Sequence, residues 1–276
     1  MASSLTSEGG VPAGNGTAPT TPALELRVKG RPRIGAPMLL RGTLLTVVVA
    51  LSTLAVLAAC GRASDNGEAK LSGPRVASDA GAALLHAGAA HLVGTISSEG
   101  RGAKLDLWMD GLNTSGTLGS INPKPGELPT HLLLVGDQVY LREPVTFWID
   151  KGFNHDDAAQ MAKKWVLTPK EAADYYRGYN LNGFAMELQQ PDDPGYQAAV
   201  TRSHWHGKSV LIATQPAPAG DTLSKPTKAT IAATGPPYPL QIDGEGGDGS
   251  ITFSDFGKHT PIRAPKDAVP LPLGRN

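Results

Sequence analysis

The chain has 276 residues, with 25 basic and 25 acidic side chains, 33 glycines, 23 prolines and one cysteine. A balanced charge without a basic footprint argues against a nucleic-acid-binding protein. A single cysteine excludes an intramolecular disulfide and a cysteine-based metal site. The length fits one domain with additional terminal segments.

The first 37 residues are rich in Ser, Thr, Gly, Pro and Ala, a composition that cannot bury a core. We predict that residues 1–37 are a disordered extension or follow a wrongly assigned start, and that translation begins at or near Met38. The alternative is a genuine cytoplasmic tail, in which the four basic residues between 27 and 33 strengthen the positive flank of the next segment.

Residues 38–59 have the layout of a secretory signal: Arg41 in the basic flank, an uncharged apolar centre, and small residues at the end. They end in Leu57-Ala58-Ala59-Cys60, which resembles the lipobox of bacterial lipoproteins. That resemblance implies a diacylglyceryl group on the Cys60 sulfur and cleavage that leaves Cys60 as the new N-terminus. The alternative is one transmembrane helix with an incidental cysteine, although the apolar run is at the short limit for a span.

Two acyl chains hold a protein stably on a bilayer, whereas one holds it only marginally. We therefore expect the membrane as a partner, through diacylglyceryl-cysteine, and a location on the outer, extracytoplasmic face of the cell membrane. The part beyond residue 59 carries a small excess of acidic residues, so nucleic acid is not an expected partner. Residues 60–77 are polar and glycine-containing, and we predict a flexible tether there, followed by one domain over 78–276.

The first part of that domain predicts one helix and then strands. Ser78 and Asp79 can cap a helix that ends near Gly88. Alternation puts Leu105, Leu107 and Met109 on one face of residues 104–110, and Gly136-Asp137 predicts a hairpin turn between residues 132–135 and 138–142. The strands are expected at residues 91–97, 104–110, 114–120, 132–135 and 138–142.

The middle of the domain predicts helices. Thr168-Pro169-Lys170-Glu171 has the pattern of a capping box and predicts a helix from Pro169 to about Arg177. Two further helices are expected over 156–164 and 181–190. Strands resume at residues 202–205, 208–214, 228–233, 238–243 and 250–256, and a proline-broken tail over the surface follows residue 261. Segregated strands and helices predict an α+β fold with a mainly antiparallel sheet.

Several short sequence motifs resemble those of one family. They are Val139-Tyr140-Leu141, Phe147-Trp148, Lys164-Trp165-Val166, Pro237-Tyr238-Pro239-Leu240 and Phe253-Ser254-Asp255-Phe256-Gly257. Their order and spacing are similar to the LppX/LprG-type lipoproteins of high-GC Gram-positive bacteria, relatives of the LolA-like carriers. The resemblance implies a strongly curved antiparallel β half-barrel with helices packed on its concave side. It also implies a space between sheet and helices that holds lipid acyl chains, and no cofactor.

A lipid tail needs an apolar cavity with few polar groups at its mouth. Alternating positions of the predicted strands supply candidates for its lining, namely Leu105, Leu107, Met109, Val139, Leu141, Leu240, Ile242, Ile251 and Phe253. The alternative is that these side chains fill an ordinary core. Phe147, Trp148 and Trp165 could gate such a cavity, or they could fill gaps between helix and sheet.

The sequence offers little for catalysis. His204 and His206 lie on one face of a predicted strand, a geometry that can bind zinc or copper, but no third ligand follows at a recognisable spacing. Asp192-Asp193 lies between prolines and predicts a loop rather than a calcium site. We therefore expect a non-enzymatic lipoprotein that binds or transfers lipid or another apolar ligand. The alternative is a surface interaction protein of the cell envelope without a ligand; its protein partner is unknown, and the domain is expected to be monomeric.

Overall fold

The computed structural model describes residues 65–98, 101–191, 194–217, 226–244 and 249–271. A short 3₁₀ helix, Glu68–Lys70, precedes α1 (Gly73–Ala87). Five strands follow: β1 (Ala89–Ser98), β2 (Arg101–Asp110), β3 (Asn113–Ser120), β4 (Thr130–Val135) and β5 (Gln138–Arg142). These are the strands that the sequence predicts, with ends that differ by a few residues.

The middle of the chain is mostly helical. It contains α2 (Val145–Asp150), α3 (His155–Met161), β6 (Val166–Leu167), α4 (Lys170–Ala173) and α5 (Leu181–Gln189). The last part returns to strands: β7 (Val200–Trp205), β8 (Lys208–Gln215), β9 (Thr227–Ala232), β10 (Pro239–Gly244), β11 (Gly249–Ser254) and β12 (Val269–Pro270).

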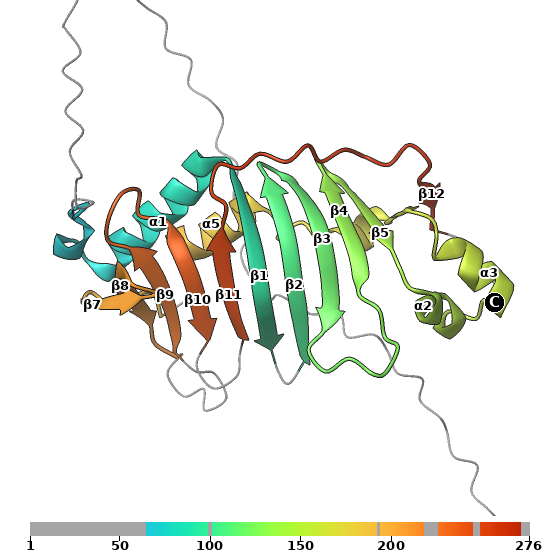
Figure 1. The fold of residues 1–276 in the computed structure, drawn as a ribbon, viewed down its shortest axis with the longest axis horizontal. Helices are drawn as coiled ribbons and strands as arrows, with labels where there is room; N and C mark the ends of the chain where they lie inside the picture. The colour runs from blue at the N-terminus through green and yellow to red at the C-terminus, as the bar shows by residue number, and fades with distance from the viewer. Residues whose placement is uncertain (1–64, 99–100, 192–193, 218–225, 245–248, 272–276) are drawn as a thin grey trace, which may run out of the picture.

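All twelve strands form one sheet, in the order β12-β6-β5-β4-β3-β2-β1-β11-β10-β9-β8-β7. Every pair is antiparallel except β12 with β6. The pairing of β1 with β11 joins the first group of strands to the last group, so strands that are far apart in sequence meet in the middle of the sheet (Figure 1). The helical middle of the chain is therefore an insertion between two halves of one continuous sheet.

Two glycines allow neighbouring strands to approach closely on the concave face of this curved, open sheet. A Cβ atom added at Gly94 of β1 would lie 2.1 Å from the Ser250 carbonyl oxygen, and one at Gly116 of β3 would lie 1.9 Å from the Asp106 carbonyl oxygen. Real Cβ atoms do not approach backbone this closely, so these positions accept only glycine in the present curvature.

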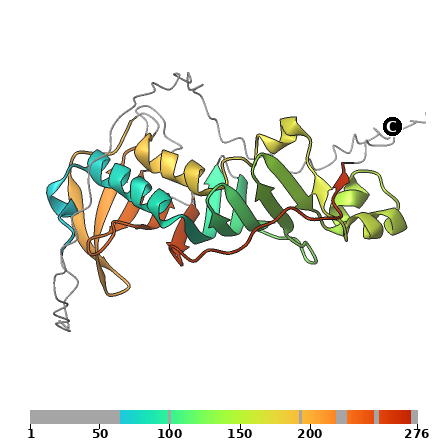
Figure 2. The ribbon, with the colours of Figure 1, turned by 90° about the horizontal axis from the view of Figure 1, so that it is seen from above.

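Helices α1 and α5 pack against each other on the concave side of the sheet (Figure 2). Helix α1 contains Pro74 in its first turn and ends at Gly88, whose φ of 71° suits glycine. Gly81 of α1 faces the Ala185 carbonyl oxygen of α5, where a Cβ atom would lie at 2.7 Å. The predicted fold class, an α+β half-barrel with helices on its concave side, is confirmed.

Three clusters of buried side chains hold the domain together. The largest lies under β1 to β5 and β11, and it includes Leu92, Leu105 and Leu132. The second lies under β8 and β9 and includes Val76 and Ala80 of α1. The third is small, and Trp148, Ala158 and Val166 form it beside α2 and α3.

Three local expectations differ from the structure. Helix α1 begins at Gly73 instead of Ser78, so the segment predicted as tether is partly helical. Helix α4 ends at Ala173, and Pro169 precedes it without a side-chain cap, so the predicted capping box is wrong. The Thr168 amide instead donates to the Val139 carbonyl, which draws this residue towards the sheet. The tail after residue 261 does not only cover the surface, because its end forms β12.

Candidate ligand-binding interior

The concave face of β1 to β5 and β11 presents an apolar surface to the helices. Alternation places every second side chain of β2 on this face, so Leu105, Leu107 and Met109 are buried. Most predicted lining residues belong to this central cluster, which contains Leu105, Leu107, Met109, Val139, Ile251 and Phe253. Leu141 and Ile242 are half-buried and pack against it. Eight of the twelve predicted residues therefore gather in one place.

A tyrosine-rich segment covers this cluster together with α5. Tyr175, Tyr176 and Tyr179 follow α4 and pack against the cluster, with the rings of Tyr175 and Tyr176 5.0 Å apart. The hydroxyl of Thr114 on β3 donates to the Tyr179 carbonyl at 2.6 Å, which fixes this cover to the sheet. Burial raises the pKa of both Tyr176 and Tyr179 well above the ordinary range. Because these phenols stay neutral, Tyr176 and Tyr179 place no charge against the apolar interior.

The central residues fit together closely in the described state. Leu105, Leu107 and Leu132 have no exposed surface, and Met109 and Leu134 have 1 %. A side chain without exposed surface borders no space large enough for a water molecule. A bound acyl chain would therefore require α5 and the tyrosine segment to move away from the sheet.

The edge of the cluster is where apolar side chains meet water. Ile96 of β1, Leu118 of β3 and Phe184 of α5 are half-buried there, and the Phe184 ring lies 5.8 Å from that of Phe253. Glu143, at the end of β5, is 7 % exposed and accepts a hydrogen bond of 2.5 Å from the Thr130 hydroxyl. Burial raises the pKa of Glu143, against the lowering effects of Thr130 and Lys151.

The remaining predicted residues lie away from this interior. Phe147 and Trp148 are in the third cluster, with ring centroids 5.2 Å apart. Trp165 lies beside Arg142, whose guanidinium is 5.0 Å from the indole ring. Leu240 is buried at an irregularity in the pairing of β10 with β9. The structure does not bring Phe147, Trp148 and Trp165 to the central cluster, which leaves no geometric basis for them as its gate.

A shallow pocket of about 390 Å³ lies where α4 meets β5 and β6. Its walls mix polar and apolar surface, and they consist of Asp137, Gln138, Leu167, Thr168, Lys170, Ala173 and Arg177. Arg177 is paired with Asp174 at 2.8 Å. Such a pocket lacks the predominantly apolar walls that an acyl chain requires.

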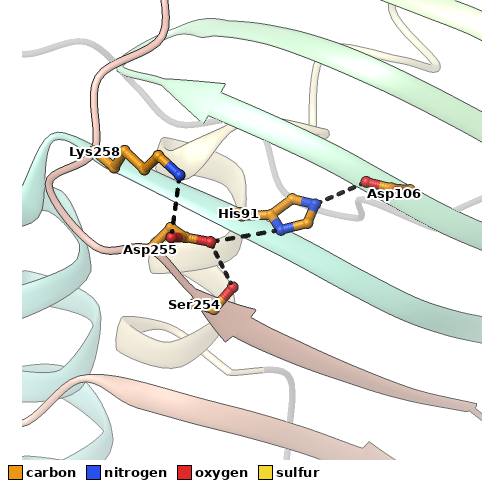
Figure 3. A network of polar contacts seen from close by, with 5 residues as sticks. All are labelled: His91, Asp106, Ser254, Asp255 and Lys258. Atoms are coloured by element: carbon orange, nitrogen blue, oxygen red, sulfur yellow. Dashed lines mark hydrogen bonds and ion pairs between the residues drawn. The ribbon is translucent and has the colours of Figure 1, made fainter.

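The convex face carries a polar network that sequence reasoning did not find (Figure 3). His91 Nε2 lies 2.7 Å from Asp106 Oδ1, and its Nδ1 lies 3.8 Å from Asp255. The His91 ring stacks on Trp108 with centroids 4.2 Å apart. The cross-strand register pairs these two residues directly, a signal that becomes visible only once β1 and β2 are aligned. The network ties the chain after β11 to the first strands.

The described residues contain no group of three or more His, Cys, Asp or Glu side chains that could hold a metal ion. His204 and His206 are both exposed, and His206 lies in a turn with a φ of 48°. Within the same residues, no helix is long and apolar enough to cross a membrane. Cys60, the predicted signal and Asp192-Asp193 lie outside the described residues.

Comparisons with known proteins give little beyond this geometry. No family model matches the chain, and no curated protein matches it. Among solved structures, the lipoprotein LppX of Mycobacterium tuberculosis matches with a TM-score of 0.37 and 14% identity, over 69% of this chain and 99% of that chain. A similarity at this level does not establish family membership, and we base no functional conclusion on it.

Proposed function

We propose that this chain is a lipid-anchored, non-enzymatic lipoprotein on the extracytoplasmic face of the cell membrane, and that it binds or transfers a lipid or another apolar ligand between sheet and helices. The observation that carries the proposal is the continuous apolar concave face, which is covered by two helices and a tyrosine segment rather than by a second sheet. The Leu-Ala-Ala-Cys ending of the signal-like segment supports the anchor.

The type of cover matters because a helical cover can separate from a sheet without breaking the sheet's own hydrogen bonds. Helix α5 meets the central cluster through few side chains, among them Leu181, Phe184 and Ala185. An acyl chain that entered there would replace these contacts with equally apolar ones. Each methylene that such a chain buries would contribute roughly 0.8 kcal/mol against the cost of opening.

The anchor is tested with Cys60→Ser in a bacterial host that processes lipoproteins. We expect the unchanged protein in the membrane fraction, with a mass that includes a diacylglyceryl-cysteine at residue 60. The variant should lose this modification and, because cleavage follows lipidation, should retain residues 38–59, which mass spectrometry detects. An unmodified Cys60 thiol in the unchanged protein would contradict the anchor.

The ligand is tested first by lipid mass spectrometry of protein purified from its native host, with stoichiometric lipid expected. A second experiment adds laurate, below its micellar concentration, to methyl-labelled protein. We expect intermolecular NOEs to the methyl groups of Leu105 and Leu107, which are buried, and none to Leu112 and Leu128, which are 54 % and 65 % exposed. NOEs confined to the two exposed leucines would contradict an interior site.

The close packing of Leu105, Leu107 and Leu132 favours a second candidate function, a surface interaction protein with a permanently closed interior. This alternative predicts no co-purified lipid and no NOE to the interior methyl groups. Lipid mass spectrometry and the NOE experiment therefore distinguish the two candidate functions.

A further inference from the structure

The first described residues are firmly attached to one end of the sheet. The Asn66 amide donates to the Ala233 carbonyl at 3.0 Å, and its side chain donates to the carbonyls of Ala232 and Gly235. Asp65 pairs with Arg202 of β7 at 2.9 Å. The folded domain thus includes residue 65, well before the sequence-based boundary at residue 78.

This early beginning limits how far the domain can move from an anchor at Cys60. Five peptide steps separate Cys60 from Asp65. A chain spans at most about 3.6 Å per residue, so the two residues lie no more than about 18 Å apart in any conformation. If residues 60–77 were a flexible tether, as the sequence predicts, the maximum distance between Cys60 and the domain would be more than three times as long.

Residue 65 lies at one end of the long axis of the domain. The 3₁₀ helix Glu68–Lys70 lies beside β7 and β8 there, whereas α2 and α3 lie at the opposite end (Figures 1 and 2). An anchor with a short reach therefore brings the β7 end to the bilayer and leaves the α3 end away from it.

The side chains at this end suit an anionic lipid surface. Residues 200–215, which form β7, β8 and their turn, include Arg202 and Lys208 and no acidic residue. Both basic side chains are exposed, as are Lys70 and the apolar Leu71 nearby. Asp65 neutralises Arg202, so the attraction to an anionic surface depends on Lys208 and Lys70. Basic residues near an anionic membrane are attracted to it, and an exposed leucine can enter the interfacial region.

We propose that the β7–β8 hairpin and the 3₁₀ helix dock this domain on an anionic membrane surface, with the long axis of the domain pointing away from the bilayer. The inference rests on the proposed lipidation of Cys60. Docking fixes the orientation in which the apolar interior meets the membrane.

The test uses the full, lipidated chain in vesicles of phosphatidylglycerol and phosphatidylcholine that carry a nitroxide on the lipid headgroup. A fluorophore is attached at Thr201→Cys in β7 or, as a control, at Lys163→Cys after α3; both positions are exposed. We expect headgroup quenching at least threefold stronger at position 201 than at position 163. A water-soluble nitroxide should quench both positions similarly without vesicles.

Equal quenching at both positions, in protein that sediments with the vesicles, would overturn the docking while leaving the anchor intact. Protein that does not sediment, with an unmodified Cys60, would overturn both the anchor and the docking. These outcomes distinguish the failure of this inference from the failure of the proposed function.

The charge contribution is tested separately with residues 61–276, which lack both Cys60 and the apolar segment before it. The double variant Lys70→Gln/Lys208→Gln should bind phosphatidylglycerol vesicles about tenfold more weakly, because each lysine near the surface contributes independently. The matched variant Lys104→Gln/Lys163→Gln changes two exposed lysines elsewhere and should bind as the parent does. Equal weakening in both variants would contradict a specific docking surface.

Discussion

At the scale of single residues, the curvature of the sheet depends on glycine at positions where strands nearly touch. Gly116→Ala should lower the free energy of unfolding by about 2–4 kcal/mol, because its Cβ would meet the backbone of Asp106 and Leu107. Gly119→Ala, on the same strand, is the matched control, since its Cβ would meet nothing closer than 3.6 Å. Urea unfolding measures both. A similar cost for both variants would show that strand propensity, and not close approach, determines the effect.

Glu143 gives a pH dependence of stability at the same scale. Burial raises its pKa above the ordinary 4.5, so the folded state holds the proton more tightly than the unfolded chain. The cost of ionising it is absent below pH 4.5 and grows as the pH rises through the raised pKa. Glu143→Gln should therefore gain stability relative to the unchanged protein as the pH rises from 4.5 to 7. Urea unfolding across this range measures the difference.

At the scale of elements, two asparagines cap helices. Asn154 accepts from the Asp157 amide at the start of α3, and Asn180 accepts from the Gly183 amide at the start of α5. Asn180 also donates to the Arg177 carbonyl and is 8 % exposed. We expect Asn180→Ala to cost about 2 kcal/mol and the exposed Asn154→Ala about 0.5–1 kcal/mol. Thermal unfolding measures both, and equal costs would contradict a special role for the cap at the cover.

The same elements show what the sequence could predict. The sequence predicted the positions of the ten long strands in the described residues. Alternation supports this prediction most clearly in β2, where Leu105, Leu107 and Met109 are buried on one face. The capping box at Thr168 failed because the sheet competes for this residue through the Val139 carbonyl. After Ala173 the chain forms turns instead of a longer helix, and these turns pack Tyr175, Tyr176 and Tyr179 into or against the central cluster. Local propensity cannot show this preference, since it depends on the distant strands that the tyrosines cover.

The candidate site follows the same division. Periodicity correctly placed Leu105, Leu107 and Met109 on one buried face, and it grouped residues from β2, β5 and β11 that meet in one cluster. It could not separate Phe147, Trp148 and Trp165 from that cluster, because their distance depends on where the inserted helices α2 and α3 lie. The sequence also could not show whether the interior is open or closed, which depends on packing against α5.

At the scale of the whole molecule, the pairing of β1 with β11 joins two groups of strands that are far apart in sequence into one folding unit. Helix α1 contributes Leu84 to the central cluster and Val76 to the second, and Ile242 packs against both. The central and second clusters therefore share side chains, so we expect these two clusters to unfold in one transition. In such a cooperative unit, a ligand of the proposed kind would enter by movement of the cover, because part of the sheet would not open on its own.

Phe253→Ala tests this unity, because Phe253 lies on β11 beside the pairing with β1 and is 2 % exposed. The truncation should cost about 3–5 kcal/mol. Fluorinated tryptophan provides reporters in both halves, at Trp108 of β2 and Trp205 of β7. Fluorine NMR during urea unfolding should show both resonances shifting to the same lower midpoint in the variant, while the exposed Leu112→Ala leaves both unchanged. The contradicting result is a lower urea midpoint for Trp108 with an unchanged midpoint for Trp205. The two halves would then unfold separately, and the sheet could open along β1 and β11 to admit a ligand.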